Sequence, residues 1–170
     1  MVPPEFPSTL AERAVLQQRA LHLAQTPASS EEGGQAGEPL LHFRLDADEE
    51  YAIAYRFLDE ILPMTPITPV PYAPQAILGV INRLGQLLPV LDLRRLLSRR
   101  ESTLHEECRI LVVRGAGMTV GIPVAEVLGK VIHRSSPRGR IDEVIEGLHE
   151  ERIMVLNVDA LLSHPTLQGR

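Results

Sequence analysis

The chain has 170 residues, enough for one domain or for two small lobes that share a core. Apolar residues make up 44% of it and charged residues 23%, which are proportions of an ordinary globular protein and exclude a disordered or collagen-like chain. The formal net charge of −5 and the lack of tryptophan, with only 4% aromatic residues, disfavour nucleic acid as the main partner.

Cysteine usage and hydropathy indicate a compartment. Cys108 is the only cysteine, so no internal disulfide can form and nothing points to an oxidising compartment. The N-terminus lacks the basic start and apolar stretch of a secretion signal, and no window of about 18 residues is uninterruptedly apolar. We therefore expect a soluble cytoplasmic protein that does not insert into a membrane.

Residues 1–38 are predicted to form a helical extension and a linker. Apolar residues recur at helical spacing over 8–24, and Thr9 followed by Glu12 is a capping-box start. The stretch 25–38 is rich in Ser, Gly, Glu and Pro, which is typical of a linker. Two interpretations of the helix stay open: a loosely docked extension, or a docking helix for a partner.

From Pro39 onward the sequence changes to short apolar runs bounded by turn residues, the pattern of an all-β fold. Runs 40–45 and 51–55 alternate on either side of an acidic turn and predict a hairpin. A short helical turn is expected near residue 56. An edge strand should follow and lead into an irregular crossing, because the prolines of 61–71 forbid regular pairing in a central strand.

The rest of the sequence repeats this pattern of short apolar runs bounded by turn residues. Strands 77–84 and 86–93 meet at Gly85, and Asp92 is placed to cap a short helix over 92–98. Further predicted strands and a last helix are 108–114, 118–124, 125–133, 144–151, 152–158 and 159–164. Each half is thus several strands closed by a short helix, which predicts two similar small barrels, with lobe one at about 39–97 and lobe two at about 98–165.

The sequence contains no complete metal-binding or catalytic motif. His105 and Cys108 have ligand spacing but lack the second half of a zinc site. Ser135 and Ser136 follow His133 without a nucleophile elbow or an orienting acid. We predict no metal, no cofactor and no catalytic residue. An anion-binding role stays open for two groups of arginines, namely Arg94, Arg95, Arg99, Arg100 and Arg134, Arg138, Arg140.

Four motifs resemble the CheW-like domain family. In chain order they are "EEYAIAYRFLDEIL", "GVINRLGQLLPVLDLRRLL", "VGIPVAEVLGKV" and "RIMVLNVDALL". The second is similar to the family's pattern Gly-Val-x-Asn-x-Arg-Gly-x-x-x-Pro-Val-x-Asp-Leu. The resemblance runs over residues 40–163 and places the domain at 39–165.

The resemblance implies two packed five-stranded SH3-like barrels without enzymatic activity. It also implies two partners: the regulatory domain of a CheA-type histidine kinase, and the cytoplasmic tip of a methyl-accepting chemoreceptor. By position, Leu58 and Glu60 on one strand and Gly79, Asn82 and Gly85 on the hairpin match the family's partner contacts. We expect Arg83 and Leu84, in the same hairpin, to bind a partner as well.

Two departures from the family pattern stand out. Arg83 and Leu84 are exchanged relative to the usual order, and on a strand a step of one residue reverses the face that a side chain occupies. Ala125 replaces the usual Asp of the third motif and follows Pro123 by two residues. We expect the first exchange to change which partner the hairpin accepts.

The sequence therefore predicts a non-catalytic adaptor that couples a chemoreceptor to a CheA-type kinase. The alternative is a divergent CheW-like regulatory subunit of a chemosensory-like pathway that controls surface motility or second-messenger output.

Overall fold

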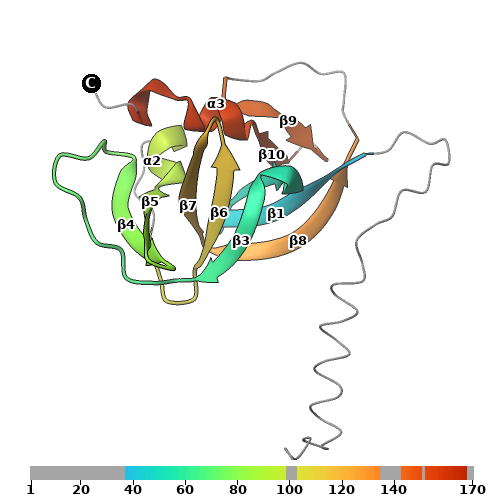
Figure 1. Cartoon of the computed structure of the whole chain (residues 1–170). Coiled ribbons are helices and arrows are strands. Elements are labelled where there is room, and N and C mark those ends of the chain that lie inside the picture. Colours follow the sequence, from blue (N-terminus) through green and yellow to red (C-terminus); the bar gives the residue numbers. More distant parts are fainter. Residues whose placement is uncertain (1–36, 99–102, 135–142, 151, 168–170) are drawn as a thin grey trace, which may run out of the picture. The chain divides into compact units, whose positions relative to one another are not determined.

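The computed structural model describes residues 37–98, 103–134, 143–150 and 152–167 (Figure 1). The predicted helix at 8–24 and nearly all of the predicted linker at 25–38 lie outside these residues. Glu38, the last residue of the predicted linker, is instead the first residue of strand β1.

Within the described residues the chain forms strands joined by short helical segments (Figure 1). The strands are β1 (Glu38–Asp46), β2 (Glu49–Ala54), β3 (Leu58–Pro63), β4 (Ile77–Arg83), β5 (Gln86–Leu91), β6 (Arg109–Gly115), β7 (Met118–Val124), β8 (Glu126–His133), β9 (Ile145–His149) and β10 (Ile153–Leu156). The α-helices are α2 (Leu93–Ser98) and α3 (Val158–Leu162), and 3-10 turns lie at Tyr55–Phe57 and Pro165–Leu167.

These strands form two five-stranded sheets. The first sheet has the order β8-β1-β2-β10-β9 and the second sheet the order β3-β6-β7-β5-β4. Strand pairing is antiparallel except between β2 and β10 and between β5 and β7. The predicted all-β fold with two five-stranded units is confirmed, as are the hairpin β1–β2 and the edge position of β3.

The division into lobes needs correction, because the two sheets exchange strands. The first sheet takes β1 and β2 from the first half of the chain and β8, β9 and β10 from the second half, whereas the second sheet combines β3, β4 and β5 with β6 and β7. A boundary near residue 97 therefore separates two similar sequence repeats but cuts through both sheets. The exchange begins at Tyr55–Phe57, where the 3-10 turn leads the chain out of the first sheet and into β3.

Alternating side chains on the central strands supply two different cores. On β6, Leu111 and Val113 enter a central cluster shared by both sheets, while Ile110 and Val112 enter a smaller cluster of the second sheet. On β2, Tyr51 and Ile53 likewise join the central cluster, and Ala52 and Ala54 join a small cluster of the first sheet. These strands are apolar on both faces because both faces are covered.

Each short helix links one sheet to a hairpin of the other. Asp92 caps α2 as predicted, with Oδ1 accepting from the Arg94 and Arg95 amides at 3.0 and 3.2 Å. The buried Arg94 side chain then reaches Asp46 at 3.0 Å and Glu49 at 3.2 Å in the β1–β2 hairpin.

Helix α3 makes the reciprocal link. Asn157 Oδ1 caps it by accepting from the Ala160 amide at 2.9 Å. Asp159 Oδ1 accepts from the Ala116 amide at 2.8 Å in the β6–β7 turn. The helix that follows the first sheet is thereby fixed to the second.

Gly79 allows the proline-rich segment after β3 to lie against β4. Thr68 and Val80 exchange two backbone hydrogen bonds of 2.9 Å. A Cβ on Gly79 would lie 2.2 Å from the Thr68 carbonyl oxygen, closer than real Cβ atoms approach any atom. Gly147, at the corresponding place in β9, has open space around the same position.

Gly79→Ala is therefore expected to lower the free energy of unfolding by about 1–3 kcal/mol, the usual cost of forcing extra atoms into a packed site. Gly147→Ala is the matched control and should change stability by less than about 0.5 kcal/mol. Urea denaturation of both variants measures the difference. Equal stability of Gly79→Ala and the wild type would contradict the close approach of Thr68.

Candidate functional site

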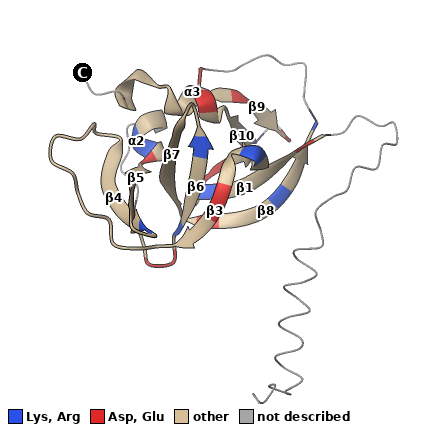
Figure 2. Ribbon diagram, viewed as in Figure 1, with Lys and Arg blue, Asp and Glu red and all other residues tan. Residues whose placement is uncertain are grey.

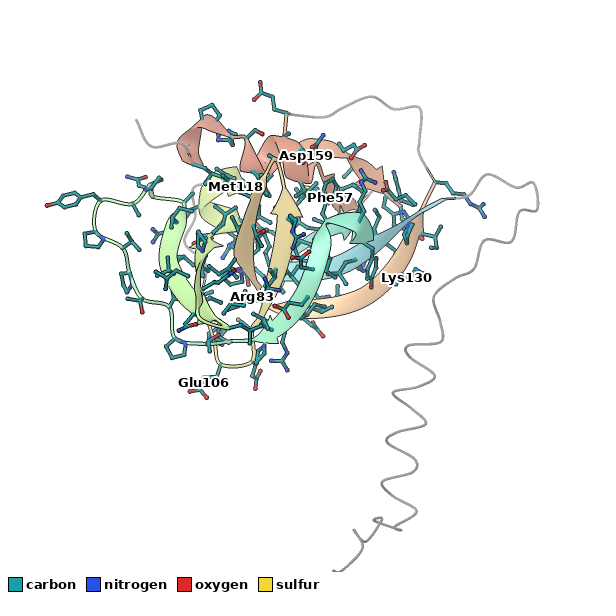
Figure 3. All side chains as sticks on the ribbon, viewed as in Figure 1. Phe57, Arg83, Glu106, Met118, Lys130 and Asp159 are labelled. Atoms are coloured by element: carbon teal, nitrogen blue, oxygen red, sulfur yellow. The ribbon has the colours of Figure 1, made fainter. Side chains whose placement is uncertain are left out.

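The predicted contact residues lie on the two edge strands of the second sheet and on one hairpin turn. Leu58 and Glu60 are on β3, Gly79, Asn82 and Arg83 on β4, and Leu84 and Gly85 in the β4–β5 turn. Although β3 and β4 are at opposite edges of the sheet, Arg83 Nε donates to Glu60 Oε1. The second sheet is therefore curved enough for side chains of its two edge strands to touch. Arg83 is labelled in Figure 3.

The Glu60–Arg83 pair covers one end of the small cluster of the second sheet. Arg83 lies two residues after the buried Ile81 and so shares its face of β4. The Arg83 side chain is 27% exposed and that of Glu60 is 36% exposed. The guanidinium is thus paired with Glu60 on β3 rather than displayed at the hairpin tip.

The β4–β5 turn displays a leucine instead. Leu84 and Gly85 have φ of 50° and 83°, and positive φ at both central residues is the mark of a type I′ hairpin. Asn82 Oδ1 accepts from the Gly85 amide at 2.8 Å and holds the turn. The Leu84 side chain is 97% exposed, although left-handed backbone is unfavourable for a leucine.

Two further exposed apolar side chains were not predicted as contact residues. Leu87, the cross-strand neighbour of Asn82, is 73% exposed, and Ile61 on β3 is 40% exposed. The alternation of side chains along a strand could have predicted the exposure of both residues. Leu88 and Leu62 pack inward, so the adjacent Leu87 and Ile61 must face outward. We call Asn82, Leu84 and Leu87 the hairpin tip.

Two of the predicted contact residues have other surroundings. Gly79 is buried beneath Thr68, and Leu58 is half-buried against the central cluster. Gly79 and the Leu58 side chain therefore support the sheet from within, whereas Asn82, Leu84 and Gly85 are exposed to solvent.

The first sheet carries a polar network that sequence reasoning missed. Glu50 lies on the sheet face opposite the central cluster and contacts His42 at 3.1 Å, Arg44 at 3.4 Å and Arg152 at 2.7 Å. The hydrogen bond from Arg152, more than any other contact, holds the pKa of the Glu50 carboxyl below its usual value. Opposite charges on β1 and β2 and at Arg152 thus pair with one another. Elsewhere in the protein, Figure 2 shows acidic positions on β3 and basic positions on β6 and β8.

The residues singled out for chemistry are placed as follows. Cys108 is buried, and its Sγ accepts from the His105 backbone amide at 3.3 Å. Arg94 pairs with Asp46 and Glu49, and Arg95 lies 3.5 Å from Asp92, so these two arginines of the anion-binding alternative are engaged. Ser135, Ser136, Arg99, Arg100, Arg138 and Arg140 lie outside the described residues.

Two absences hold for the described part of the chain. Its His, Cys, Asp and Glu side chains form no group of three or more suited to a metal ion. Across the same residues, no helix has both the length and the apolar character needed to cross a membrane.

Comparison with known proteins assigns the family. A family model described as the CheW-like domain matches residues 39–166. The chain belongs to the CheW-like domain family. Its fold is similar to that of the scaffolding protein TtCheW from Thermoanaerobacter tengcongensis, with a TM-score of 0.66 and 20% identity over 82% of this chain and 96% of that one. No curated protein matches the chain significantly.

Within this CheW-like domain, the residues of the two departures from the family pattern lie as follows. The exchange of Arg83 and Leu84 turns the guanidinium inward to Glu60 and leaves the leucine at the tip. Ala125 is half-buried at the β7–β8 corner, where its amide donates to the Arg44 carbonyl oxygen at 2.9 Å, and Pro123 is buried in β7.

A double-mutant cycle with Glu60→Gln and Arg83→Gln should give a coupling free energy of about 0.5–1 kcal/mol, the range of a partly exposed ion pair. Molar salt should reduce it, because neither side chain is fully buried. The control cycle uses Asp59 and Arg114, whose arginine is 66% exposed and whose coupling should be smaller. No coupling between Glu60 and Arg83 would show that the pair does not join the sheet edges.

Proposed function

We propose that this protein is a non-catalytic cytoplasmic adaptor that couples a methyl-accepting chemoreceptor to the regulatory domain of a CheA-type histidine kinase. The observation that carries the proposal is a CheW-like domain that occupies residues 39–166 and displays an apolar hairpin tip. Its partners would bind surfaces, and no reacting group is required.

The hairpin tip supports a binding role on physical grounds. Leu84 adopts an unfavourable backbone conformation and is almost fully exposed, so it contributes nothing to the core of its own chain. Burying a leucine against a partner would stabilise a complex by about 1.5–3 kcal/mol. Leu87 on the neighbouring strand would extend the same contact.

The outward face of β3 supplies a second contact. Side chains alternate along β3, so Asp59 and Ile61 face solvent while Glu60 pairs with Arg83 on β4. Ile61 gives that face an exposed apolar side chain.

The inward-turned Arg83 favours a second candidate function. A tip without its guanidinium would suit a partner with an apolar pocket in place of an acidic one. This fits a divergent CheW-like regulatory subunit in a pathway that controls surface motility or second-messenger output. Binding only to a kinase paired with a diguanylate-cyclase-type regulator would favour this candidate.

Calorimetric titration of the full chain with the regulatory domain of a CheA-type kinase from the same organism tests the proposal. We expect saturable binding that Leu84→Asn weakens about tenfold, because the variant loses an apolar contact. The double exchange Arg83→Leu with Leu84→Arg should alter which kinase domain binds best.

Tyr72→Asn is the matched control. Tyr72 is also fully exposed and left-handed, with φ of 60°, and asparagine tolerates that backbone at both positions. The control should bind like the wild type. Failure of both the wild type and the double exchange to bind any kinase domain would refute the coupling role.

A further inference from the structure

The first sheet is closed by two histidines from its opposite edges. His133 is the last residue of β8 and His149 the last of β9, and these strands are the two ends of the sheet order. The two Nδ1 atoms lie 3.3 Å apart, with ring centroids 5.5 Å apart and planes at 67°. Because β8 and β9 do not pair as strands, this contact between side chains spans the gap between them.

The contact depends on how many protons the pair carries. A hydrogen bond between two Nδ1 atoms needs one N–H donor and one lone pair, so a neutral pair or a pair with one extra proton can make it. When both rings are protonated, two N–H groups face each other and two positive charges meet. The second extra proton therefore removes the hydrogen bond and adds repulsion.

The surroundings oppose that second proton more than they favour it. The pKa of His133 is lowered, first by its burial and next by the charge of His149, while Glu146 on β9 acts in the opposite direction. Glu150 lies 3.7 Å from the other ring nitrogen of His149.

Other charged residues lie near the two histidines in sequence or strand register. Glu38 on β1 is in register with His133 but pairs with Arg56. Arg152, which precedes β10, pairs with Glu50. Lys130 and Arg134 on either side of His133 add positive charge along β8. Glu38 and Arg152 are thus engaged by partners other than the two rings.

We propose that His133 and His149 form a pH-sensitive latch that holds the edges of the first sheet together near neutral pH and releases them on acidification. The proposal rests on the fold and is independent of the chain's partners.

The direction of the pH dependence follows from linkage. In the unfolded chain His133 has its ordinary pKa of about 6.5. In the folded chain the pKa of His133 is lower, so folding disfavours the protonated form. The stabilisation is therefore complete above about pH 6.5 and decreases as the pH falls to the lowered pKa of folded His133.

Urea denaturation between pH 7.5 and 5.0 tests the latch in the full chain. The denaturation midpoint of the wild type should fall more steeply than that of His133→Gln, whose glutamine still offers a hydrogen bond but does not titrate. His105→Gln removes an exposed histidine outside the pair and should follow the wild-type profile. Superimposable profiles for the wild type and His133→Gln would overturn the proposal.

A second measurement does not require the variant at position 133 to fold. Ring resonances of the wild type, followed by NMR, should show His133 titrating below its ordinary pKa and rising toward it in His149→Gln. An ordinary pKa for His133 that is unchanged by His149→Gln would also overturn the latch.

Discussion

Strands β1, β2, β6 and β7 turn alternate side chains into one apolar layer, and this layer holds the two sheets together. It includes Phe43 and Ile53 from the first sheet and Leu111 and Ile122 from the second. Each half of the chain must supply strands to both sides of the layer, because the chain leaves the first sheet after β2 and returns to it only at β8. Helices α2 and α3 strengthen the exchange, through Arg94 in one direction and Asp159 in the other.

With the centre of the protein so constrained, the edges of each sheet are left to polar contacts. Glu60 and Arg83 meet across the second sheet, and His133 and His149 meet across the first. Arg83, His133 and His149 are each the last residue of a strand, whereas Glu60 lies within β3. A scaffolding role suits such a fold, since the β4–β5 hairpin turn and outward-facing side chains are exposed while the shared layer keeps them in fixed positions.

The parts of the fold that depend on near neighbours could be predicted from the sequence. Alternation gave the hairpins, prolines marked β3 as an edge strand, and Asp92 marked the start of α2. The exchange of strands could not be predicted, because both halves carry the same alternation and nothing local tells β3 which sheet to join. The contact of Arg83 with Glu60 is also long-range, and it depends on the curl of the whole sheet. Leu84 was predicted as a contact residue from the resemblance, and its exposure became visible only with the turn geometry.

The strand exchange is tested most directly by cutting the chain between the repeats. Fragments 37–102 and 103–170 each contain strands of both sheets, so each alone is expected to lack strand circular dichroism and a cooperative unfolding transition. Mixed in equal amounts, they should recover both signals. Cooperative unfolding of either fragment alone, as a monomer, would contradict the account and restore the simpler arrangement of two sequential lobes.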